Sequence, residues 1–138
     1  LSKIASGGEL SRIMLAIRSV FSAGDTSDTL IFDEIDTGIS GRAANKVAVK
    51  LRGAAAERQV ICVTHLAQIA AAAGSHFEIS KSVREGKTYT KVEKLDIEGR
   101  KRALAAIIGG MQITAAQLES AQEMLMQAGN SQTTGKGD

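Results

Sequence analysis

The chain has 138 residues, of which 43% are hydrophobic, 23% charged and only 3% aromatic, with no proline. This composition suits one globular domain whose core is built from alanine, leucine, isoleucine and valine. The net charge is +2 and the basic residues are scattered, so charge alone predicts no nucleic-acid surface. Cys62 is the single cysteine, which excludes an internal disulfide and a cysteine-rich metal site, and its apolar strand favours an inert core thiol. No apolar run reaches the ~18 residues of a membrane span.

Hydrophobic periodicity predicts a first helix over 8–23. Its apolar residues recur at spacings of three and four and would form one face: Leu10, Ile13, Met14, Ile17, Val20 and Phe21. The later elements are predicted as a strand at 29–33, a helix at 41–56, a strand at 59–64, a short helix at 66–73, strands at 77–83 and 88–95, and helices at 99–108 and 114–128.

The order of these elements predicts an α/β fold. Alternating strands and helices indicate a mainly parallel sheet with flanking helices. Gly86, in the short linker 84–87, adds a β-hairpin. Residues 1–129 are expected to form the domain, and 130–138, rich in Ser, Thr, Gly and Lys, a disordered tail.

Two adjacent carboxylates, Asp33 and Glu34, follow the apolar run 29–32. Open α/β sheets bind ligands outside the carboxyl ends of their strands. One acid can hold Mg²⁺ through water, while the next orients and deprotonates an attacking water. A strand that ends in a solvated acidic turn is the alternative, because this pattern is common.

Two further segments could contribute to the same chemistry. Ser6 and Glu9 form a Ser-x-x-Glu capping box, and Gly7 and Gly8 leave the amides of a helix start open to a phosphate. The alternative is an ordinary cap with flexible glycines. His65 follows the apolar run 60–64 and could bond a phosphate or a catalytic water, although a lone histidine there is more often structural.

In this order, the three segments resemble the second half of an ABC-type ATPase head. Residues 5–9 resemble the signature motif, with Ala5 where leucine is usual, and 30–34 resemble the Walker B strand. Residues 37–40 fall at the D-loop, with Ser40 in place of the usual aspartate, and His65 matches the switch histidine.

The residues that follow the acids narrow the resemblance. Transporter ATPases usually carry Pro-Thr there, whereas Ile35-Asp36 is similar to the SMC-like branch that maintains chromosomes and repairs DNA. The closest likeness is to bacterial members that act in double-strand-break repair. The strings that carry it are 1–12, 32–41, 63–70, 95–100 and 107–111.

The resemblance implies an ATPase of DNA double-strand-break repair that uses ATP and Mg²⁺. Asp33 would bind Mg²⁺ through water, Glu34 would be the catalytic base, and His65 would contact the γ-phosphate. The residues expected to contribute to nucleotide binding are Ser6, Gly7, Gly8 and Glu9 of the signature, and Thr37, Gly38 and Ser40 of the D-loop.

The sequence contains no Gly-x-x-x-x-Gly-Lys-Ser/Thr segment, which is the phosphate-binding Walker A loop. The resemblance therefore implies the carboxyl-terminal lobe of a split head, and Leu1, which is no natural start, also suggests a fragment. We expect the isolated chain to be inactive and to expose apolar surface. The expected partners are an amino-terminal Walker A lobe, a second head in a homodimer, and DNA, without membrane, in the cytoplasm at the nucleoid.

Two other functions remain open on the sequence. One is a non-enzymatic module that dimerises or binds a partner. The other is a fragment of a transporter ATPase, against which Ile35-Asp36 and the lack of a coupling insert both argue.

Overall fold

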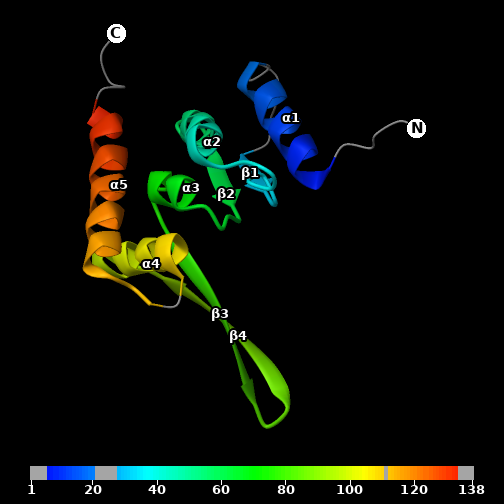
Figure 1. The fold of residues 1–138 in the computed structure, drawn as a ribbon. Coiled ribbons are helices and arrows are strands. Elements are labelled where there is room, and N and C mark those ends of the chain that lie inside the picture. The colour runs from blue at the N-terminus through cyan, green and yellow to red at the C-terminus, as the bar shows by residue number, and fades with distance from the viewer. Residues whose placement is uncertain (1–5, 21–27, 111, 134–138) are drawn as a thin grey trace. The chain divides into compact units, whose positions relative to one another are not determined.

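The computed structural model describes residues 6–20, 28–110 and 112–133, and the chain divides into two compact units, 1–72 and 73–138. The elements of the first unit are α1 (Gly7–Val20), β1 (Thr29–Phe32), α2 (Gly41–Ala54), β2 (Gln59–Cys62) and α3 (Ala67–Ala72) (Figure 1). Those of the second are β3 (Phe77–Arg84), β4 (Lys87–Lys94), α4 (Ile97–Gly109) and α5 (Ala115–Thr133).

The predicted order of helices and strands is confirmed. Residues 21–23 of the first predicted helix lie outside the described residues. The last helix continues to Thr133, so residues 130–133 are helical where a tail was predicted. The assignment of 1–129 to one lobe stays a prediction.

The sheet is less extensive than the alternation indicated. β1 and β2 form a parallel pair, and β3 and β4 form a separate antiparallel pair. The mixed α/β class is therefore confirmed, whereas a mainly parallel sheet holds for β1 and β2 only, within the described residues. The hairpin strands pair with each other because a two-residue turn joins them.

The core of the first unit lies between β1 and the helices. Strand residues alternate between the two faces of a sheet, and Leu30 and Phe32 point towards the helices. α2 contacts both α1 and α3, so it lies at the centre of the helical layer. The buried cluster consists of Leu15, Leu30, Phe32, Ile35, Ala48, Leu51 and Ile69.

The predicted apolar face of α1 does not face this core. The helix packs through Leu15, which is 3% exposed. The predicted face is 40–56% exposed at its described positions, Leu10, Ile13, Met14 and Ile17. The side chain of Val20 and all of Phe21 lie outside the described residues. The expectation of exposed apolar surface is thus confirmed on α1.

The two parallel strands are covered on one face only, where Leu30 and Phe32 are buried and Val60 and Cys62 are half-buried. Ile31 lies opposite Ile61, and these side chains are 70% and 45% exposed. The apolar runs 29–32 and 60–64 are thus not buried throughout, because among the described residues the helices of this unit cover only the face of Leu30 and Phe32.

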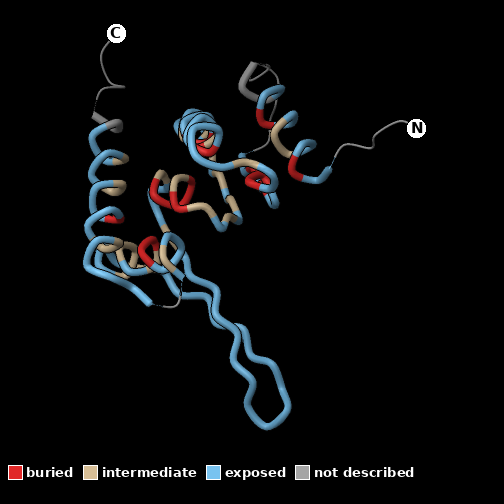
Figure 2. The backbone as a smooth tube through the Cα atoms, in the orientation of Figure 1, coloured by how far each residue is buried: buried red, intermediate tan, exposed pale blue. Residues whose placement is uncertain are grey.

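The second unit combines a hairpin with two helices. All residues of β3 and β4 are exposed, as Figure 2 shows along the hairpin. Glu85 and Gly86 both have positive φ, 50° and 74°, which gives the two-residue turn whose twist matches paired strands.

The two helices of this unit pack on each other and have defined ends. Asp96 caps α4 by accepting a hydrogen bond from the Gly99 amide at 2.7 Å, and Gly110, with φ 74°, follows its end. The buried residues of the pair are Leu104 and Ala105 of α4 and Ala121 of α5. No described helix is long and apolar enough to cross a lipid bilayer.

Candidate functional site

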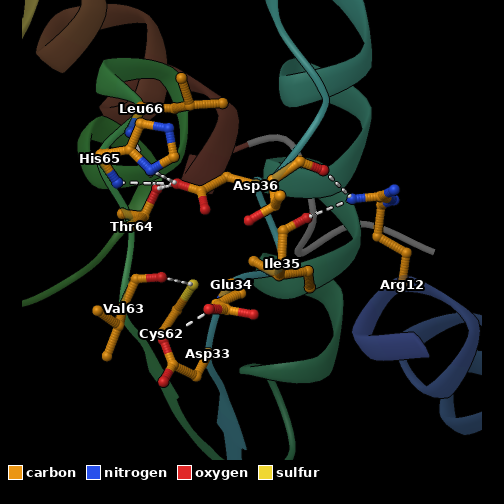
Figure 3. A network of polar contacts seen from close by, with 11 residues as sticks. Arg12, Asp33, Glu34, Ile35, Asp36, Cys62, Val63, Thr64, His65 and Leu66 are labelled. Carbon is orange, nitrogen blue, oxygen red and sulfur yellow. Dashed lines mark hydrogen bonds and ion pairs between the residues drawn. The ribbon is translucent and has the colours of Figure 1, made fainter. Parts of the chain in front are cut away.

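The loops that follow β1 and β2 lie next to each other at one edge of the parallel pair. Val63 continues the pairing, since its amide donates to the Phe32 carbonyl at 2.9 Å. The chain then turns away from both strands at the same level, through 33–36 and 64–66. The structure therefore brings the predicted site residues Asp33, Glu34 and His65 to a common edge (Figure 3).

The two acids are exposed at the end of β1 and differ in geometry. Asp33 Oδ1 accepts a hydrogen bond from the Glu34 amide at 2.9 Å. Glu34 has φ 56°, a left-handed conformation that is uncommon outside glycine and that clusters at functional sites. The Thr37 amide donates to the Glu34 carbonyl at 3.0 Å and closes a turn. This turn holds the Glu34 carboxylate at the surface, where it can reach water.

Asp33 and Glu34 could contribute to a magnesium site whose other ligands are water molecules and phosphate oxygens. No group of three or more metal-binding side chains occurs in the described part of the chain. Mg²⁺ is commonly bound by one or two carboxylates together with waters and substrate phosphates, rather than by a protein cage. Asp33, exposed and adjacent to Glu34, could supply one such carboxylate.

The start of α1 packs directly on the acidic loop, residues 33–37, which carries Asp33 and Glu34. A Cβ atom added to Gly8 would lie 2.7 Å from the Glu34 carbonyl oxygen and 2.9 Å from Thr37 Cβ. One added to Gly7 would lie 2.7 Å from Glu34 Oε2. Gly8 is thus required for close approach to the backbone of the loop, whereas at Gly7 only the flexible end of the Glu34 side chain would have to move. The sequence pattern alone did not indicate this constraint.

Two side chains of α1 also bond to the backbone of this loop. Ser11 Oγ donates to the Asp33 carbonyl at 3.0 Å. Arg12 Nη1 donates to the carbonyl oxygens of Ile35 and Thr37 at 3.1 and 2.7 Å. The start of α1 and the loop with the two acids are therefore packed together and linked by hydrogen bonds.

The capping box at the start of α1 is confirmed. The Ser6 amide donates to Glu9 Oε2 at 2.9 Å, and the Glu9 amide donates to Ser6 Oγ at 3.3 Å. The bond from the Ser6 amide is the main cause of the lowered pKa of Glu9. Both side chains thus serve the helix start, and a role in nucleotide binding stays a prediction.

His65 is held by a residue to which the sequence assigned no role. Asp36 is 2% exposed, and its Oδ2 atom accepts hydrogen bonds from Thr64 Oγ1 at 2.6 Å and from the His65 amide at 2.8 Å. The same oxygen lies 3.0 Å from His65 Nδ1, while the imidazole is 73% exposed. Burial raises the pKa of the Asp36 carboxyl, but the bonds from Thr64 and His65 and the charge of the ring bring it below its ordinary value.

Asp36 could not be found from local pattern. It follows Glu34 closely and reads as a further acid of a solvated turn, and its partners are 28 and 29 residues away. The only available signal was the pair Ile35-Asp36, which served as a mark of the family branch.

Several curated proteins are similar to this chain over most of its length. No protein-family model matches the chain. The DNA repair protein RecN of Bacillus subtilis is 44% identical over 135 residues, which cover 98% of this chain and 23% of RecN. RecN of Haemophilus influenzae is 49% identical over 125 residues, or 91% of this chain and 22% of RecN. RecN of Treponema pallidum is 45% identical over 136 residues, or 99% and 24%.

The chain resembles RecN over nearly its whole length. It spans less than a quarter of the RecN proteins that it matches. A solved structure from work on ATP-driven dimerisation and DNA-stimulated activation of SMC ATPases superimposes with a TM-score of 0.56 and 26% identity. That alignment covers 78% of this chain and 65% of the other. The similarity to bacterial repair proteins that the longer strings indicated is confirmed, and the roles of individual motif residues stay predictions.

Residues 37–40, the predicted D-loop, lead from the acidic loop into α2. Gly38 has φ 74°, and the Ile39 amide donates to the Asp36 carbonyl at 3.3 Å. Ser40 occupies the N-cap position of α2 without a side-chain cap bond. Thr37, Gly38 and Ser40 are all exposed, so each is accessible to a ligand or to a second copy.

Cys62 is half-buried beside the site. Burial, followed by the negative charges of Asp36 and Asp33, raises the pKa of its thiol to about 11. The thiol is therefore protonated at neutral pH, which agrees with the predicted inert role.

Proposed function

We propose that this chain is the catalytic lobe of a RecN-like ATPase that acts in DNA double-strand-break repair. The observation that carries the proposal is the placement of Asp33, Glu34 and His65 at the adjacent ends of two parallel strands. The similarity to RecN and the fold shared with an SMC ATPase support it. Adjacent strand ends are where α/β folds of this kind bind nucleotides.

The residues of the chain divide the work as follows. Mg-ATP, when bound, supplies the γ-phosphate that water attacks. Asp33 holds Mg²⁺ through water, and Glu34 orients that attacking water and accepts its proton. His65 lies across the edge from Glu34 and contacts the γ-phosphate or the water. Asp33 and Glu34 are exposed, so substrate can reach them without a rearrangement of the core.

A second lobe must supply the phosphate-binding loop, since this sequence contains none. We propose that an amino-terminal segment of the same protein covers the exposed apolar faces of α1 and of the parallel pair. Ser6, Gly7 and Gly8 would then meet nucleotide held by a second head, in a head-to-head homodimer. The chain by itself should bind no Mg-ATP in calorimetry, and micromolar binding would contradict the split head.

The replacement of Glu34 by glutamine tests the central assignment. Glu34→Gln keeps the shape of the side chain but cannot accept a proton, so the turnover of the full-length ATPase should fall by ~10²–10⁴-fold. Mg-ATP should still bind, and dimers should accumulate in light scattering.

The matched control is Glu57→Gln. Glu57 is exposed and lies two residues before β2, away from the strand ends that carry the site. The full-length ATPase with Glu57→Gln should hydrolyse ATP at the parent rate. If Glu34→Gln does so as well, Glu34 is not the base.

DNA is the partner that we propose for α2. This helix carries four basic residues and no acidic one. Arg42, Lys46 and Lys50 are exposed and four residues apart, about 6 Å along the helix axis. Like charges at this spacing repel one another, and duplex DNA, with one charge per ~1.7 Å of axis, would relieve the repulsion.

The salt dependence of DNA binding tests this stripe. Replacing Arg42, Lys46 and Lys50 by glutamine should reduce the slope of log K against log salt by up to ~2.7, because each phosphate contact contributes ~0.9. A control with Lys81, Lys87 and Lys94 replaced makes the same change in net charge on the hairpin. Equal slopes for both variants would show that α2 is not the contact.

A further inference from the structure

One buried carboxylate is not used by the proposed reaction. Asp36 sits three residues after Asp33, the proposed magnesium ligand, yet it is buried. Its Oδ2 atom accepts hydrogen bonds from the Thr64 hydroxyl and the His65 amide, and His65 Nδ1 lies 3.0 Å from the same oxygen. These contacts all come from Thr64 and His65, on the loop after β2. A buried carboxylate is costly unless it is well hydrogen-bonded, so this arrangement holds the loop after β2 against the loop after β1.

We propose that Asp36 is a positioning residue that sets the tautomer and the direction of the His65 imidazole. An ionised carboxylate can only accept hydrogen bonds. His65 Nδ1 lies 3.0 Å from Oδ2, and an unprotonated nitrogen there would turn its lone pair towards the carboxylate. The single proton of a neutral ring therefore belongs on Nδ1, and Nε2 is the nitrogen left to act on a ligand. The inference rests on the proposed function, in which His65 faces the γ-phosphate and the attacking water.

This geometry limits what His65 can do. With its proton on Nδ1, the neutral ring presents a lone pair at Nε2 and can accept a hydrogen bond from the attacking water. It can donate from Nε2 to a phosphate oxygen only as the doubly protonated cation, with the Asp36 carboxylate as its counter-charge. An exposed histidine without Asp36 would be free to place its single proton on either nitrogen and to turn about its side-chain bonds.

Asp36 is itself held in place on both sides. Ile35 is fully buried, and Arg12 donates to the carbonyl oxygens of Ile35 and Thr37, which flank Asp36 in sequence. On the other loop, Thr64 Oγ1 donates to Asp36 and accepts from the Leu66 amide at 3.1 Å. The aim of the imidazole thus depends on the segment that also carries Glu34, which keeps base and histidine in register.

The nitrogen chemical shifts of the histidine rings test the proposal in the chain itself. At a pH where the rings are neutral, long-range ¹H–¹⁵N spectra distinguish a proton on Nδ1 from one on Nε2. We expect the Nδ1–H form for His65 in the parent chain. His76, the other of the two histidines, lies in the second unit and is the internal reference.

Three variants separate positioning from a merely structural contact. Asp36→Ala removes the acceptor and should shift His65 towards Nε2–H, the form that free imidazole side chains favour in water. Asp36→Asn keeps an oxygen where the Thr64 hydroxyl and the His65 amide require an acceptor, so it should retain Nδ1–H. Thr64→Val removes the neighbouring hydroxyl and should leave the His65 tautomer unchanged.

Two results would overturn the inference. The first is an Nε2–H ring in the parent chain, a measurement that needs no variant to fold. The second is an Nδ1–H ring in folded Asp36→Ala, with the His76 signals at their parent positions.

Turnover of the full-length ATPase separates this inference from the proposed function. If Asp36 acts through His65, Asp36→Ala and His65→Ala should each lower kcat by about 10–10²-fold with little change in KM, and the double variant should be no slower than either. The parent chain could show the Nδ1–H ring while His65→Ala keeps full turnover. In that case the tautomer assignment would stand, and the role of His65 in hydrolysis would be refuted. If the loss of kcat in the double variant is instead the product of the two single losses, Asp36 does not act through His65.

Discussion

Gly8 offers a direct measure of how tightly α1 packs on the acidic loop. In Gly8→Ala the new Cβ would lie 2.7 Å from the Glu34 carbonyl oxygen and 2.9 Å from Thr37 Cβ. Neither atom is the free end of a flexible side chain, so the helix or the loop has to move. Overpacking of this kind typically costs about 1–3 kcal/mol, and the better helix propensity of alanine offsets at most about 1 kcal/mol. We expect a net loss of about 1–2 kcal/mol.

Two other glycines provide matched controls for the same substitution. Gly53, in the last turn of α2, has nothing within 4 Å of a built Cβ, so Gly53→Ala should stabilise the chain by about 0.5–1 kcal/mol. Gly7→Ala meets only the mobile carboxylate end of Glu34, at 2.7 Å. It should change stability little, but it should displace the proposed base and lower turnover in the full-length ATPase.

Urea unfolding, followed by circular dichroism, measures these differences from the transition midpoint and slope. The midpoints should rank Gly53→Ala above the parent and Gly8→Ala below it. If Gly8→Ala is as stable as Gly53→Ala, the start of α1 does not pack on the loop in solution. The prediction that Gly7→Ala displaces Glu34 would then lose its structural basis, because it depends on the same packing.

Three further predictions concern the turn, the core and the buried acid. Glu85→Asn should stabilise the hairpin by about 0.5–1 kcal/mol in thermal unfolding, because φ is 50° there and asparagine tolerates that conformation; an unchanged midpoint would contradict the two-residue turn. Leu104→Ala, at a fully buried position, should cost about 2–5 kcal/mol, whereas Ile97→Ala on the same helix, at 60% exposure, should cost much less; equal losses would contradict the packing of α4. The folded-state pKa of Asp36 is lowered, so its contribution to stability is complete above the unfolded value near ~3.9 and is lost as pH falls through the folded value. Urea midpoints of Asp36→Asn should therefore fall less steeply than those of the parent below pH ~4, and parallel curves would show that the carboxylate is not stabilised by folding.

Local sequence was sufficient for the features that depend on neighbouring residues. The capping box of Ser6 and Glu9 and the turn at Gly86 are set by side chains and backbone within four residues, so their patterns could be read directly. The order of helices and strands followed from hydrophobic period for the same reason. The three motifs were sufficient to indicate an ABC-type ATPase head, and the longer strings around and beyond them indicated the similarity to RecN, because their residue types and order are specific.

Tertiary structure decided the features that depend on distant contacts. Periodicity located an apolar face on α1 but could not say what it faces, and Leu15 rather than that face packs on the core. The parallel pairing of β1 and β2 brings Asp33 and His65 to one edge. It also places Asp36, which reads as one more solvated acid, against Thr64 and His65. A hydrogen bond between residues 28 positions apart leaves no local pattern, because it forms only after both strands have found their register.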